Sequence, residues 1–93
     1  MQQFEIVIVD KLPKTKESVE NAREWLLNHL KMFGIEMKYF SIKSFGAYSY
    51  GEAYMGIATL ASEEPITLEK LNRILPEDKP EVKGLSGRAL REI

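Results

Sequence analysis

The stretch that decides the fold is FEIVIV, residues 4–9. β-Branched residues dominate it, with Phe4, Ile6 and Ile8 on one side and Val7 and Val9 on the other, and apolar residues on both faces are typical of a central strand covered on both sides. Pro13 follows at a short distance, and proline cannot continue a central strand. The sequence therefore predicts a strand in the middle of a sheet, a short connection, and then a different element.

Residues 16–33 have the pattern of an amphipathic helix. Thr15 or Ser18 can cap its first turn, and Gly34 can close it in the left-handed conformation. Between these signals, apolar residues recur at spacings of 3, 4, 4 and 3, which places them on one side of a helix: Val19, Ala22, Leu26, Leu30 and Phe33.

The next segment reads as a long β-hairpin. Residues 35–45 alternate between polar and apolar until the Tyr39–Phe40 pair, where a bulge would restore the phase. FGAYSYG, residues 45–51, contains two glycines and predicts the connection. Residues 52–61 then form the returning strand.

A second helix is predicted over residues 66–75, capped by Thr67, and a final strand around residues 89–93. The order β, α, β, β, α, β with right-handed crossovers predicts an α+β protein of the ferredoxin-like type. We therefore expect a single domain, residues 1–93, in which two helices cover one face of a four-stranded antiparallel sheet.

Composition excludes several kinds of chemistry. The 93 residues carry a net charge of −1, no cysteine and one histidine, His29, so disulfides, thiolate metal sites and cysteine nucleophiles are absent. No motif for a metal or cofactor stands out, and we expect neither. Apolar runs are too short to span a bilayer, and no signal peptide is evident, so we expect a cytoplasmic protein with no membrane partner.

Three segments resemble the RNA-recognition motif: VIVDKLP (7–13), GEAYMGIATLASEEP (51–65) and GLSGRALREI (84–93). That family stacks RNA bases on aromatic side chains of its first and third strands. The matching positions here are Ile8, Met55 and Ile57, none of which is aromatic. The resemblance thus implies the fold, while RNA binding through the sheet does not follow.

The same positions predict a protein-binding surface. If the helices cover Val7, Val9 and the even-numbered residues 54–60, the open face of the sheet is apolar, and such patches usually mark an interface. Its predicted residues are Phe4, Ile6, Ile8, Met55 and Ile57, with Tyr48 and Tyr50 adding specificity at the rim. The leading hypothesis is a non-enzymatic regulatory module that forms a homodimer or docks on a larger protein. The alternative cover for this face is the chain's own carboxy-terminal segment.

A single-stranded RNA or DNA binder is the second hypothesis. It would stack bases on the hairpin and hold phosphates with nearby cations, using Lys43, Phe45, Tyr48, Tyr50, Lys83, Arg88 and Arg91. We do not expect an enzyme, because no pair of groups is nominated for acid–base chemistry. His29 lies at the edge of the apolar stripe, and we expect it to be partly buried and hydrogen-bonded.

Overall fold

The computed structural model describes residues 1–11, 15–48 and 51–93. The elements follow in the predicted order, as β1 (Gln2–Asp10), α1 (Lys16–Lys31), β2 (Ile35–Tyr48), β3 (Gly51–Ser62), α2 (Leu68–Ile74) and β4 (Leu85–Glu92). The α+β class and the βαββαβ order are confirmed.

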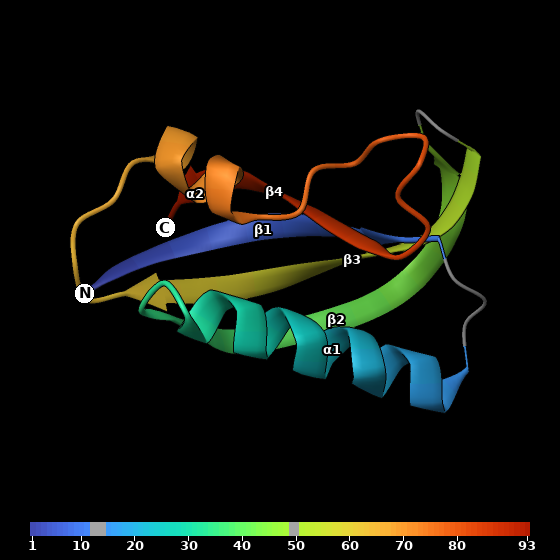
Figure 1. The fold of residues 1–93 in the computed structure, drawn as a ribbon, viewed down its shortest axis with the longest axis horizontal. Coiled ribbons are helices and arrows are strands. Elements are labelled where there is room, and N and C mark those ends of the chain that lie inside the picture. The colour runs from blue at the N-terminus through green and yellow to red at the C-terminus, as the bar shows by residue number, and fades with distance from the viewer. Residues whose placement is uncertain (12–14, 49–50) are drawn as a thin grey trace.

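The described strands form one antiparallel sheet in the order β2-β3-β1-β4. β1 lies inside the sheet, as FEIVIV predicted, and pairs with β3 on one side and β4 on the other. This arrangement is consistent with a ferredoxin-like fold. Figure 1 shows the two helices lying along the sheet and the β2–β3 hairpin curving away at one end of the molecule.

The predicted caps of α1 are confirmed. The Thr15 hydroxyl accepts a hydrogen bond from the Ser18 backbone N–H at 3.0 Å, and the Ser18 hydroxyl oxygen accepts one from the Thr15 N–H at 2.9 Å. This capping box satisfies amides that the helix leaves without partners. Gly34 adopts a φ of +72° just beyond the helix. α1 ends at Lys31, two residues before the predicted end, and Phe33 is exposed.

One buried cluster joins both helices to the sheet. The helices contribute Leu26 and Leu30 from α1 and Leu71 from α2, and the sheet contributes Phe4, Ile6, Ile8, Ala58, Leu60 and Ala89. The register explains this grouping, because Phe4 pairs with Leu60 and Ile6 with Ala58, and directly paired side chains point to the same side. We call the side that carries these residues the covered face and the opposite side the open face.

The prediction that Phe4, Ile6 and Ile8 lie on the open face is therefore wrong. Their side chains are at most 1% exposed, against the helices. The prediction placed Ile8 on the same face of the sheet as Met55. In the structure Ile8 pairs with Gly56, the neighbour of Met55 on β3, and adjacent positions of a strand face opposite sides. A shift of one residue moves every side chain of a strand to the other face.

The β2–β3 hairpin is longer and more irregular than predicted. Register shifts lie between Met37 and Tyr39, one residue before the predicted bulge, and between Ile42 and Ser44. Residues 45–48, predicted as connection, continue β2 instead. At Gly56 the backbones approach so closely that an added Cβ would lie 1.7 Å from the Ser41 carbonyl oxygen. The strong curvature of the hairpin therefore requires glycine at this position.

The last two elements also differ in length from the prediction. α2 is shorter, although Thr67 caps it as predicted, accepting from the Lys70 N–H at 3.1 Å. β4 begins at Leu85 and runs along the sheet edge to Glu92. The carboxy-terminal segment is therefore a strand of the sheet and does not lie across the open face.

Candidate protein-binding surface

The open face has an apolar centre on the two inner strands. Val7 of β1 pairs with Ile57 of β3, and Val9 pairs with Met55. Ile57 is 43% exposed, while the other three side chains are half-buried. Met55 and Ile57 thus lie on the open face as predicted, but their partners there are Val7 and Val9. We call these four residues the apolar strip.

Mixed polar and apolar side chains flank the strip on both outer strands. Tyr39 and Ser41 of β2 pair with Thr59 and Ile57, and Tyr39 is 48% exposed. On β4, Arg88 pairs with Val7, and Leu90 is 44% exposed. An apolar centre within a polar surround is the usual anatomy of a protein–protein interface.

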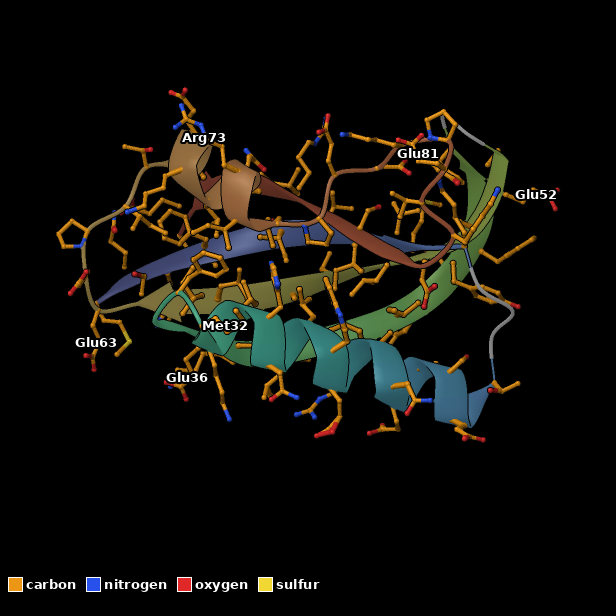
Figure 2. The ribbon with its side chains drawn as sticks, viewed as in Figure 1. Met32, Glu36, Glu52, Glu63, Arg73 and Glu81 are labelled. Atoms are coloured by element: carbon orange, nitrogen blue, oxygen red, sulfur yellow. The ribbon has the colours of Figure 1, made fainter. Side chains whose placement is uncertain are left out.

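The end of the hairpin bends over one end of the open face. The Lys11 ammonium, just past β1, lies 5.5 Å from the centroid of the Tyr48 ring. Ser86 pairs with Val9, and Ala53 pairs with Gly46 and lies two residues before Met55, so both belong to the open face by alternation. Each of them is nevertheless only 2% exposed. Glu52 and Glu81 lie at this same end of the molecule in Figure 2, where the hairpin meets the segment before β4. The hairpin therefore covers part of the sheet that would otherwise be open.

Lys11 contacts both the hairpin and the segment after α2 at this end of the molecule. Its ammonium donates a hydrogen bond to the Lys79 carbonyl oxygen at 2.7 Å and pairs with the Asp78 carboxylate at 2.9 Å. Desolvation lowers the pKa of Lys11, but the hydrogen bonds to Asp78 and Tyr48 and the attraction of both groups outweigh it, and the pKa is raised above its ordinary value. The ammonium thus links the start of the β1–α1 connection to the hairpin and to the segment after α2.

The aromatic hairpin differs from the predicted recognition loop. The Tyr48 hydroxyl is buried, and its ring is approached by Lys11. Phe45 is 58% exposed and contacts Tyr54, with ring centroids 5.0 Å apart. Tyr50, the other predicted rim residue, lies outside the described residues. Of this group, Phe45 alone presents a largely exposed ring among the residues the structure describes.

The predicted cations do not gather at the hairpin. Arg88 and Arg91 are exposed on β4, at the opposite edge of the sheet from β2, which carries Lys43. The Arg91 guanidinium lies 3.4 Å from the Glu5 carboxylate. Lys83 is exposed in the segment before β4. This separation gives little support to a phosphate-binding surface centred on the hairpin.

His29 is partly buried and hydrogen-bonded, as predicted. Its Nε2 lies 2.7 Å from the Ile74 carbonyl oxygen, and its ring stacks on Trp25 at a centroid distance of 5.0 Å. The described residues contain no group of three or more His, Asp or Glu side chains that could hold a metal ion. Within the same described ranges, no helix has the length and apolarity needed to cross a membrane.

Comparison with known proteins identifies no family. The sequence matches no protein-family model, and no curated protein shows a significant match. The resemblance to the RNA-recognition motif thus stays a prediction.

Val7 and Val9 are the surface residues that the sequence prediction missed. The signal that identifies them is Glu5, which shares their phase within residues 4–9, whereas the alternate phase of that stretch contains Phe4, Ile6 and Ile8. The more uniformly apolar phase belongs against the helices.

Proposed function

We propose that this chain is a small, non-enzymatic, cytoplasmic interaction module with a ferredoxin-like, RNA-recognition-motif-like architecture, in which both helices lie on one face of the sheet. It acts through the open face, and a second copy of the chain is the partner we infer. The observation that carries the proposal is the Val7–Ile57 pair, an apolar cross-strand pair on the inner strands with Ile57 43% exposed.

Self-association fits the position of the apolar strip. Because β1 and β3 are the inner strands, a two-fold axis passing near Val7 and Ile57 would place the strip of one copy on that of the other, with polar edges outside. Covering about 400 Å² of apolar surface yields roughly 10 kcal/mol, and association costs about 4 to 15 kcal/mol. The surplus is then at most about 6 kcal/mol, so the expected dimer is weak, with a dissociation constant of about tens of micromolar or higher.

The test measures molar mass by light scattering at several concentrations. The wild type should shift with concentration from the chain mass of 10.7 kDa toward twice that mass. Ile57→Asp should stay at the chain mass with unchanged far-UV circular dichroism, because a carboxylate on the strip would be desolvated in the dimer. Leu68→Asp is the matched control, since Leu68 is a 37% exposed aliphatic residue on α2.

A wild type that remains monomeric at every concentration, or an Ile57→Asp variant that associates like the wild type, would overturn the proposal. The nucleic-acid hypothesis gives a different result, namely salt-dependent binding of mixed-sequence single-stranded oligonucleotides. Detecting such binding in the monomeric Ile57→Asp variant would favour that second function.

A further inference from the structure

A pocket of about 460 Å³ lies on the covered side of the sheet, between α1 and the segment that joins α2 to β4. This volume falls within the range of about 300 to 1,000 Å³ that is usual for small-molecule sites. Asp10 lies beneath the pocket at the end of β1, but its side chain is fully buried, so a ligand cannot reach it. The surface that a ligand would meet is therefore provided by the partly exposed residues of the lining.

These partly exposed residues form two walls. α1 supplies one wall from positions three or four residues apart, together with a neighbour, and the segment before and into β4 supplies the other: Ser18, Asn21, Ala22 and Trp25, and Pro76, Val82, Gly84 and Leu85. None of these described residues carries a charge. The part of the described lining that a ligand can reach is thus neutral and mostly apolar.

Trp25 is held in position on its wall. Its indole stacks on the His29 ring at a centroid distance of 5.0 Å and an interplanar angle of 9°, and the His29 Nε2 lies 2.7 Å from the Ile74 carbonyl oxygen. A ring that is already oriented loses little conformational freedom when a second ring packs on it. Because the indole is also 49% exposed, this wall favours an aromatic ligand.

Asn21 is the polar group available to such a ligand. The Ser18 hydroxyl is engaged in its capping hydrogen bonds with Thr15, whereas the exposed Asn21 amide makes no hydrogen bond with another described residue. An amide can donate to or accept from one polar group of a ligand. A charged group entering the pocket would lose hydration without meeting an opposite charge in the lining described above, so the pocket favours a neutral molecule.

We propose that this pocket binds a small, neutral aromatic compound with one hydrogen-bonding substituent, such as an aryl alcohol. The ring lies between Trp25 and the apolar wall of Pro76 and Val82, and the substituent meets the Asn21 amide. The apolar strip is on the opposite face of β1, so this inference does not depend on self-association.

The test follows the indole N–H of Trp25 by ¹⁵N nuclear magnetic resonance, because the chain has a single tryptophan and hence a single indole N–H signal. The neutral probe is 2-naphthalenemethanol, and its charged analogues are 2-naphthoate and 2-naphthylmethylamine. We expect a saturable shift of the indole signal with the alcohol. Both ions should bind at least about fivefold more weakly, because each loses hydration in a lining without a charged partner.

Two variants locate the binding. Ala22→Leu fills the pocket from α1 and should weaken binding of the alcohol at least about tenfold. Asn21→Ala, at an exposed position, removes the polar contact and should weaken binding about two- to tenfold, which keeps the test decisive if Ala22→Leu fails to fold. Asn28→Leu is the matched control, because it adds a leucine at an exposed position of α1 that does not line the pocket, and should bind as the wild type does.

Three results would overturn the proposal. The first is no saturable shift of the indole signal with 2-naphthalenemethanol. The second is a carboxylate or amine analogue that binds as tightly as the alcohol. The third is unchanged affinity for the alcohol in a folded Ala22→Leu variant or in Asn21→Ala.

Discussion

Replacing Gly56 by alanine is the sharpest test of the hairpin geometry. A Cβ at this position would lie 1.7 Å from the Ser41 carbonyl oxygen and 2.7 Å from the Ile42 Cα, whereas real Cβ atoms essentially never approach closer than 3.0 Å. Both neighbours are backbone atoms of β2, which cannot move as the end of a flexible side chain can. The variant must therefore separate β2 from β3 around the Ile42–Gly56 pair.

The expected loss of stability follows from the backbone hydrogen bonds between β2 and β3. Giving up two backbone hydrogen bonds at about 1 kcal/mol each, with some loss of packing by Ile42, lowers the free energy of unfolding by about 2 to 3 kcal/mol. For a domain of this size, Tm should fall by about 8 to 24 °C. Calorimetry or thermal circular dichroism measures the change.

Gly87→Ala is the matched control for this prediction. A Cβ there would meet its nearest neighbours at 3.6 and 3.7 Å, which is ordinary van der Waals contact. Since alanine restricts the unfolded chain more than glycine does, Tm should stay the same or rise slightly. If Gly56→Ala melts within the error of the wild type, or if both variants lose the same stability, the close approach of β2 and β3 at Gly56 is wrong.

Two further predictions concern the phase of β1 and the Lys11 contacts. Ile8→Ala should lower the free energy of unfolding, measured in denaturant, by about 2 to 5 kcal/mol, because Ile8 is buried. Ile57→Ala, measured in dilute protein, should lower it by about 1 kcal/mol or less. Equal losses in the two variants would contradict the assignment of faces. Because the folded-state pKa of Lys11 is raised, its contribution to stability is complete below the unfolded value near 10.5 and is lost as pH rises through the folded value. Lys11→Met should therefore lose less stability than the wild type as the pH rises above about 10.5. Free energies of unfolding that fall in parallel for the two proteins over this pH range would refute the prediction.

Local signals in the sequence were sufficient for the helices. The capping pair of Thr15 and Ser18 and the positive φ of Gly34 depend on residues within a few positions of each other, so reading the chain locally identifies them. The order of elements followed from the same kind of evidence. The ends of α2 and β4 were less exact, because tertiary contacts decide how far an element continues.

The two faces of β1 could not be assigned from its apolar residues alone. Val7 and Val9 are as typical of a strand interior as Ile6 and Ile8, and the phase depends on pairing with β3, which is distant in the sequence. A pocket lined by Asp10, Trp25 and Val82 also escaped prediction, since only the fold brings these residues together. The hairpin curvature depends on the close approach of two backbones at Gly56, which no side-chain pattern records.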